Sequence, residues 1–282
     1  MRGFRTLLAG GSAVLLSAGL ALGGTAAATA GTHHQSAAPA PPTGFTIVPG
    51  QRAGGSGLTQ VKYTNWSGYA DAGSAEKYSK VSSSWTQPKI TCNPSISGYQ
   101  WAVFWVGIDG FSNGTVEQDG SEAYCIGGKG PYYGTWWEHY PVNDIQTVGT
   151  SVKAGDKITA SVVLSGTKYT VKITDATTPA NSFTRSFTCS ATACADTSAE
   201  WIAESPGGDD TASGLYPLAQ FAPWTNSNSA VANPSKSGTI KTFPDDEITM
   251  VSASDGTTVK AKPGALNSSG TTFGVTWESA GP

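Results

Sequence analysis

The sequence predicts an all-β domain made of two packed antiparallel sheets, with little helix. Apolar and polar residues alternate with a period of two along most of the chain from residue 61 onwards, and no stretch there sustains a helical period. Gly, Ser, Thr and Trp are plentiful, whereas charged residues make up 13% of the chain, against a usual share of about 25%. This composition favours many short strands joined by tight turns.

Residues 1–30 have the pattern of a secretory signal peptide. Arg2 and Arg5 form a basic start, an apolar stretch diluted by Gly and Ser covers 7–22, and the small residues Ala28 and Ala30 flank Thr29 as in a cleavage site. The apolar stretch is shorter than the roughly 20 residues that a membrane span needs. We therefore expect an exported, extracellular protein without a membrane segment.

Residues 31–60 are expected to be a flexible leader or a short propeptide. They consist mainly of small and polar residues, and such a stretch cannot bury enough apolar surface to offset the entropy lost on ordering. Residues 61–282 then form one domain, a length that suits a single large β-sandwich.

The charge balance argues against a nucleic-acid binder. Three of the 17 basic residues and none of the 20 acidic residues precede position 61, so the domain carries a net charge near −6. A polyanion would be repelled by this balance. It suits a domain that stays soluble in mildly acidic surroundings.

The four cysteines are expected to form two disulfides because they are an even set in an exported chain. Cys189 and Cys194 flank four residues and are predicted to close a small loop, which leaves Cys92 to pair with Cys125. A zinc site is not expected, since no C-x-x-C spacing occurs and His139 is the only histidine of the domain. Neither a metal nor a cofactor is expected.

The alternation also predicts individual strands. Residues 157–164 and 169–173 alternate on either side of Ser165 and Gly166, which indicates a hairpin. Similar runs lie near 61–70, 79–87, 99–109, 132–140, 183–188, 199–204, 239–252 and 271–277. So many strands with short turns predict two sheets packed face to face.

The same period assigns residues to faces. In 99–109 one face is apolar and is expected to be core: Ala102, Phe104, Val106 and Ile108. The other face carries Trp101, Trp105 and Asp109, which are expected to meet solvent or a groove, because exposed aromatic surface of that size marks binding sites.

Two further strands carry polar residues in the same way. Trp136, Glu138 and Tyr140 share a face, and Glu200, Ile202 and Glu204 lie opposite Trp201 and Ala203. Trp66 and Trp85 are expected in the core.

An ordered set of short motifs resembles the glutamic peptidases, also called eqolisins, over essentially all of 61–282. The motifs are NWSGY at 65–69, WTQP at 85–88, WVGIDG at 105–110, QDG at 118–120, WEHYP at 137–141 and EWIAE at 200–204. One such string would be weak evidence. The set in the family's order is strong evidence.

The resemblance implies a bent β-sandwich of two antiparallel sheets, concanavalin-like or jelly-roll-like, with substrate lying across a concave face. It implies that Gln118 and Glu204 are the catalytic dyad of an endopeptidase. The positions that line or support the groove are Trp105, Asp109, Glu138 and Tyr140. His139 stands where many fungal members carry Trp, and Asp119 where Thr or Ala is common, so substrate preference is not carried over.

The chemistry of the two residue types agrees with these roles. A carboxylate such as Glu204 can deprotonate a water that attacks a peptide carbonyl and then return the proton to the leaving amine. The amide of Gln118 can donate a hydrogen bond to the oxyanion, a contribution of roughly 3 to 4 kcal/mol in comparable donors. A Glu near its ordinary pKa of about 4.3 is partly ionised in acid, so we expect acid activity on polypeptides, by a monomer.

Alternative readings of the same residues exist. Gln118 lies in a turn-prone QDG string, and Glu200 shares a face with Glu204. Glu138 would also suit a structural partner of a Trp N–H or a Tyr hydroxyl. A Ser-His-Asp hydrolase is disfavoured, because the domain has one histidine and no G-x-S-x-G string.

Two other classes of protein would fit the same pattern. A carbohydrate-binding β-sandwich would display aromatic side chains on a concave face, here Trp101, Trp105, Trp136 and Tyr140. A glycoside hydrolase would use two carboxylates, for which Glu138 and Glu204 are the candidates.

Overall fold

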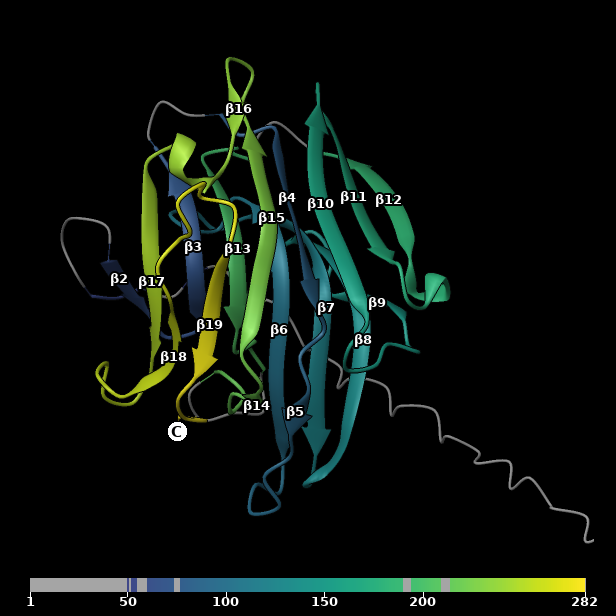
Figure 1. The fold of residues 1–282 in the computed structure, drawn as a ribbon, viewed down its shortest axis with the longest axis vertical. Helices are drawn as coiled ribbons and strands as arrows, with labels where there is room; N and C mark the ends of the chain where they lie inside the picture. The colour runs from purple at the N-terminus through teal and green to yellow at the C-terminus, as the bar shows by residue number, and fades with distance from the viewer. Residues whose placement is uncertain are drawn as a thin grey trace, which may run out of the picture. The chain divides into compact units, whose positions relative to one another are not determined.

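The computed structural model describes residues 50, 52–54, 60–73, 77–189, 194–208 and 214–281 (Figure 1). The predicted signal peptide and most of the predicted leader lie outside the described residues. The strands are β1 (Arg52–Gly54), β2 (Gln60–Tyr63), β3 (Trp66–Ala72), β4 (Lys80–Thr86), β5 (Ile90–Thr91), β6 (Tyr99–Ile108), β7 (Val116–Ile126), β8 (Lys129–Tyr140), β9 (Gln146–Gly149), β10 (Lys157–Ser165), β11 (Lys168–Asp175), β12 (Phe183–Thr188), β13 (Ser198–Glu204), β14 (Gln220–Phe221), β15 (Trp224–Ala232), β16 (Ser237–Gly238), β17 (Asp245–Val251), β18 (Val259–Pro263) and β19 (Phe273–Trp277).

Helix is confined, among the described residues, to two short 3-10 turns, η1 (Pro179–Asn181) and η2 (Ile240–Thr242). The predicted all-β class is therefore confirmed. None of the described helices is long and apolar enough to cross a membrane.

The strands form one large sheet that is almost closed on itself, plus a small sheet of β5 and β14. Pairing is antiparallel except between β2 and β17, which are parallel. The prediction of two separate sheets is not met. The reason is β15, which pairs with β19 through Trp224–Asn226 and with β4 through Ser227–Ala232, so hydrogen bonds join the two layers.

The predicted hairpin is present as β10 and β11, with Ala160 opposite Ile173 and Val162 opposite Val171. These two strands pack on β6 and β7. The core between them contains the row predicted from the sequence, all fully buried: Ala102, Phe104, Val106 and Ile108.

A second buried cluster lies on the other face of β6, and it corrects the prediction for that face. Trp101, Trp105 and Asp109 are fully buried instead of meeting solvent. Aromatic side chains from neighbouring strands cover one another there. Trp66 packs edge-on against Trp105 with ring centroids 4.9 Å apart, and Trp136 belongs to the same cluster.

Both predicted disulfides are confirmed. Cys92 is bonded to Cys125 and Cys189 to Cys194. The first joins the segment after β5 to β7. The second joins Cys189, just after β12, to Cys194, and residues 190–193 lie outside the described residues.

Three residues of the predicted leader join the large sheet as β1. Arg52 lies opposite Tyr63 of β2, and Gly54 lies opposite Lys62. Just before this strand, the amide of Gly50 donates to the carbonyl of Gly110, 3.1 Å away. Described residues that pair with the large sheet therefore include some that precede residue 61.

Candidate active site

Five neighbouring strands bring the sequence motifs onto one surface. β8 pairs with β7, β7 with β6, β6 with β13, and β13 with β3. Residues directly opposite each other on paired strands point to the same face of a sheet. By this register Gln118, Glu138 and Glu204 share the face of the Trp105 cluster.

Glu138 orients the amide of Gln118. The Nε2 of Gln118 donates to Oε2 of Glu138 over 2.8 Å, and both residues are fully buried. Because an ionised carboxylate only accepts hydrogen bonds, this contact fixes which end of the amide points to Glu138. The Oε1 of Gln118 has no hydrogen-bond partner among the described residues. The amide thus keeps acceptor capacity for another group.

Both carboxylate oxygens of Glu204 accept hydrogen bonds from side-chain N–H groups. Trp105 Nε1 donates to Oε2 over 2.8 Å, and Asn65 Nδ2 donates to Oε1 over 3.3 Å. Burial raises the pKa of Glu204 well above its ordinary value, the Trp105 hydrogen bond opposes this, and the nearby charge of Glu138 adds to the rise. Glu204 and Glu138 therefore influence each other's ionisation.

Two glycines make room for Trp105. A Cβ atom at Gly120 would lie 2.7 Å from the Cβ of Trp105, and one at Gly107 would lie 2.7 Å from its ring atom Cζ3. A side chain at Gly107 would push the indole ring away, and one at Gly120 would also meet the carbonyl oxygen of Phe104, 2.3 Å away, and would push on the backbone of β6. The glycines of the WVG and QDG motifs thus keep the Trp105 N–H aimed at Glu204.

Asp109 holds a loop at the end of β6. Its carboxylate accepts from the backbone amides of Ala195, Asp196 and Thr197, at 2.8, 2.7 and 2.8 Å, and from Asn113 Nδ2 at 2.8 Å. Its backbone lies at φ 73°, a region that Asp tolerates better than most residues. These contacts explain its burial without any contact to Gln118 or Glu204.

Tyr140 lies at the end of β8 and is partly buried against the buried cluster that contains Trp105. Of the predicted site residues, the hydrogen bonds thus join Gln118 to Glu138 and Trp105 to Glu204. They place Asp109 in a separate network.

The alternative carboxylate, Glu200, has a different environment. It is fully buried on the same face of β13, but neither of its oxygens has a hydrogen-bond partner among the described residues. Burial raises the pKa of Glu200, and the charges of Asp109 and Asp71 raise it further. Burial thus disfavours the ionised form of both carboxyl groups, but Glu204 has N–H donors that stabilise its ionised form.

Sequence reasoning assigned no role to two residues beside Glu204. Asn65 lies in the NWSGY motif, which was a usable signal. Lys260, whose Nζ donates to the Oγ of Ser205 next to Glu204, lies in no motif. Nothing in its sequence surroundings separates it from Lys262.

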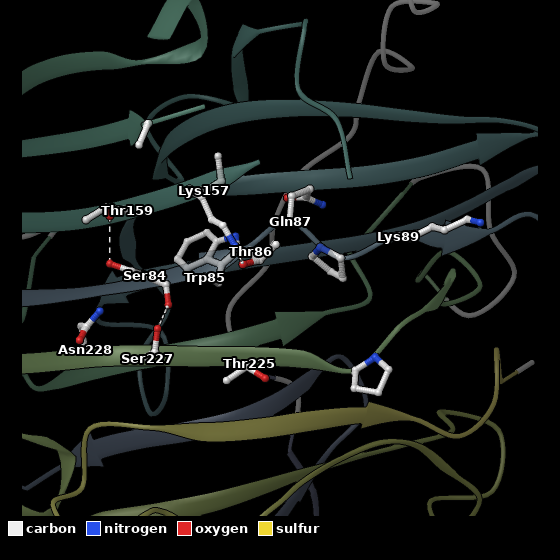
Figure 2. A pocket seen from close by; sticks show the side chains of 14 residues that line it. Ser84, Trp85, Thr86, Gln87, Lys89, Lys157, Thr159, Thr225, Ser227 and Asn228 are labelled. Atoms are coloured by element: carbon white, nitrogen blue, oxygen red, sulfur yellow. Dashed lines mark hydrogen bonds between the residues drawn. The ribbon is translucent and has the colours of Figure 1, made fainter. Parts of the chain in front are cut away.

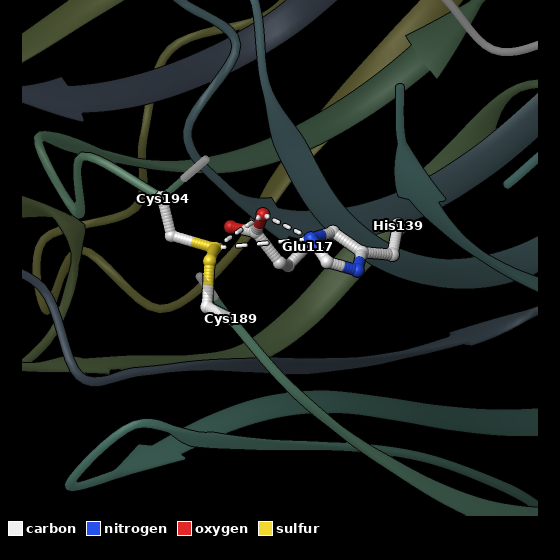
Figure 3. Close-up of side chains that lie close together, drawn as sticks. All are labelled: Glu117, His139, Cys189 and Cys194. Atoms are coloured by element: carbon white, nitrogen blue, oxygen red, sulfur yellow. Dashed lines mark hydrogen bonds and ion pairs between the residues drawn. A yellow bond between two sulfur atoms is a disulfide. The ribbon is translucent and has the colours of Figure 1, made fainter. Parts of the chain in front are cut away.

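Glu117 points to the opposite face of β7 from Gln118 and contacts His139 and the second disulfide (Figure 3). His139 Nε2 lies 3.5 Å from Glu117 Oε1, and the imidazole stacks on Phe187. Burial lowers the pKa of His139. The sulfurs of Cys189 and Cys194 are bonded to each other, so neither is the thiolate that a zinc site would use.

A pocket over β4, β10 and β15 contains neither Gln118 nor Glu204 (Figure 2). Its polar lining includes Ser84, which bonds to Thr159 and accepts at its carbonyl from Ser227. No carboxylate is among the described residues that line it. It therefore offers no carboxylate that could act as the general base on a peptide bond.

Comparison with known families identifies the class of protein to which the chain belongs. The model of the peptidase A4 family matches residues 64–273. The chain belongs to this family, the glutamic peptidases. The resemblance drawn from the motifs is confirmed, and the protein is a glutamic endopeptidase.

The fold of this peptidase is similar to two crystal structures of scytalido-glutamic peptidase. One is a complex with a transition state analog inhibitor, with 21% identity and a TM-score of 0.62. The other holds a peptide based transition state analog, with 22% identity and a TM-score of 0.62. Each match covers 76% of this chain and 98% of the other. No curated protein matches the chain.

Proposed function

We propose that this peptidase is secreted and hydrolyses peptide bonds in acid with a Glu204/Gln118 dyad. The observation that carries the proposal is that Glu204 and Gln118 lie on the same face of joined strands. Glu204 is held by two N–H donors, and the Gln118 amide is held by Glu138. We also propose that substrate lies across the face of the large sheet that β3, β13, β6, β7 and β8 form.

In the proposed reaction, ionised Glu204 removes a proton from a water molecule as the water attacks the peptide carbonyl. The carbonyl oxygen becomes negatively charged and accepts a hydrogen bond from the Gln118 amide. Glu204 then gives the proton to the leaving amine, so the carboxylate is restored. This sequence needs a proton acceptor and a neutral donor, which are the two groups present.

The proposed pH dependence follows from the environment of Glu204. Burial raises its pKa, so the rise in activity as Glu204 ionises should lie above the ordinary Glu value of about 4.3. Activity should fall again towards higher pH, where the form that donates a proton to the amine is depleted. The result is a maximum in mild acid.

We propose roles for four of the surrounding residues. Trp105 and Glu138 position the dyad, and Tyr140, partly exposed at the end of β8, contacts the bound peptide. Asp109 supports the fold beside them, since its oxygens are used by the 194–197 segment.

We further propose that residues 1–30 direct export, that 31–60 act as a leader or short propeptide, and that the enzyme acts as a monomer. Two disulfides suit an oxidising, extracellular environment. Mass spectrometry of the secreted protein would give its N-terminus and its mass.

Incubating the purified enzyme with a denatured protein at pH 4 and pH 8 tests the activity, with the products read by mass spectrometry. We expect internal cleavage at pH 4 and little at pH 8. Release of reducing sugar from glycans without peptide cleavage would instead support a glycoside hydrolase using Glu138 and Glu204. Binding of an oligosaccharide without cleavage of peptides would instead support a carbohydrate-binding role.

A further inference from the structure

We propose that Lys260 is a positioning residue for the catalytic carboxylate: its buried ammonium group holds the two chain segments that present Glu204 and Asn65, and its charge favours ionised Glu204. The inference rests on the proposed role of Glu204. It adds a cation to a site that otherwise contains two carboxylates and neutral donors.

Lys260 is buried in a way that is unusual for lysine. It lies on β18, is 1% exposed, and is among the largest fully buried side chains of the described residues. Lysine is almost never fully buried unless it is paired. Lys262, two residues further on the same strand, is exposed. The burial therefore belongs to this position and not to the strand.

The ammonium group is hydrogen-bonded to neutral oxygens on both sides of the carboxylate. Its Nζ donates to Ser205 Oγ over 3.0 Å and to the carbonyl of Thr64 over 3.5 Å. Ser205 Oγ uses its own proton to donate to the carbonyl of Tyr216 over 2.6 Å. The hydroxyl is thus oriented to accept from Lys260.

These contacts flank the hydrogen bond between Asn65 and Glu204. Thr64 precedes Asn65 in the chain, and Ser205 follows Glu204. The backbone amide of Ser205 also donates to the carbonyl of Asn65 over 2.9 Å. Lys260 therefore connects both segments through Thr64, the neighbour of the donor Asn65, and Ser205, the neighbour of the acceptor Glu204.

The charge of Lys260 is not cancelled by a direct partner. The ion pairs among the described residues include none with Lys260. Burial lowers the pKa of Lys260 to about 8, against which the charge of Glu204 acts. The group is therefore a cation throughout the acid range.

Two charged groups thus act on Glu204 from different strands. Glu138, from β8, opposes its ionisation. Lys260, from β18, favours it. The side chains that contact Glu204 directly, Trp105 and Asn65, are neutral donors. Without the cation, a fully buried carboxylate beside a second one would ionise only at higher pH.

The test is the pH profile of kcat/KM for Lys260→Met, which keeps the length of the side chain and removes its charge. The substrate is a peptide without ionisable groups near the cleaved bond. We expect the acid limb to move to higher pH by about one unit, a tenfold loss of kcat/KM on that limb. Lys262→Met is the matched control and should leave the limb in place.

A structural role alone would give a different result. It would lower the plateau of kcat/KM and leave the acid limb where it is in wild type, and that outcome overturns the proposal. If Lys260→Met does not fold, Lys260→Arg is measured instead, because it keeps the charge. The acid limb of its kcat/KM profile is expected at the wild-type pH, and a shift of that limb to higher pH contradicts the inference.

Glu204→Gln, measured in parallel, separates this inference from the proposed function. An active Glu204→Gln enzyme refutes the dyad itself. An inactive Glu204→Gln enzyme together with an unshifted limb in Lys260→Met refutes only the role of Lys260.

Discussion

Replacing Glu138 by Gln tests how the oxyanion donor is held and how the catalytic base is tuned. In the wild type, the Gln118 amide donates to the Glu138 carboxylate over 2.8 Å in a buried site. Glutamine at 138 has the same shape and can still accept from Gln118, but it carries no charge. The substitution thus changes the strength of one hydrogen bond and removes one negative charge near Glu204.

The weaker hydrogen bond should lower kcat, and the lost charge should shift the pH profile of kcat/KM. A hydrogen bond to a charged group contributes about 1.5 to 3 kcal/mol, and a neutral one about 0.5 to 1.5 kcal/mol. A loss of about 1 to 1.5 kcal/mol in holding Gln118 corresponds to a fall in kcat of about 5- to 13-fold. Removing the charge that raises the pKa of Glu204 should move the acid limb of kcat/KM to lower pH.

The assay is a full profile of kcat and kcat/KM between pH 2 and pH 8 on one peptide. Glu122→Gln is the matched control. Glu122 is also a buried carboxyl group, but it lies on β7 and accepts a hydrogen bond from Trp101, not from Gln118. A Glu138→Gln enzyme with wild-type kcat and an unshifted acid limb would refute the reasoning.

Three more outcomes are expected. Burial raises the pKa of Asp71 to about 9 and of Glu117 to about 10. Below about pH 4 both carboxyl groups are protonated in the folded and in the unfolded protein. As pH rises towards the raised pKa values, the unfolded protein releases these protons more readily than the folded protein, so the free energy of unfolding falls. The thermal midpoint should therefore be higher at pH 4 than at pH 8, and a midpoint that rises with pH would contradict this. Replacing Cys92 and Cys125 by Ser opens a link with a sequence separation of 33 and should lower the free energy of unfolding by about 3 to 4 kcal/mol, measured by urea titration; an unchanged midpoint would count against it. Serine-directed and thiol-directed reagents and chelators should leave the cleavage rate unchanged, and inhibition by a chelator that zinc reverses would refute the proposed mechanism.

Local pattern was enough to predict many of the strands and the main core, but it did not mark β7, β15 or β18, and the predicted run 239–252 also contains the turn η2. The alternation in 157–173 fixed the β10–β11 hairpin, because pairing across a short turn depends only on nearby residues. The two disulfides followed from the spacing of the cysteines. Closure of the large sheet could not be predicted, since it depends on β15 pairing with both β4 and β19, which lie far apart in the sequence.

The candidate site residues that lie in sequence motifs could be predicted, but the burial of site residues, which depends on packing between distant strands, could not. Alternation placed Trp101 and Trp105 on the correct face, but it cannot tell whether other aromatic residues cover that face, and they do. Lys260 and Lys262 are equivalent in the pattern. Residues 278–281 distinguish them: Glu278 and Ser279 donate to the carbonyl of Lys260, and Gly281 lies beside the Lys260 side chain.

The most direct test of the account is the value of kcat/KM for Glu204→Gln compared with Glu200→Gln. Both changes remove a fully buried carboxyl group from the same face of β13, so they match in their demands on folding. With folding verified by circular dichroism, Glu204→Gln should lower kcat/KM at least about a hundredfold, and Glu200→Gln should leave most of the activity. A folded Glu204→Gln enzyme with near-normal turnover, or the reverse order of the two variants, would contradict the account.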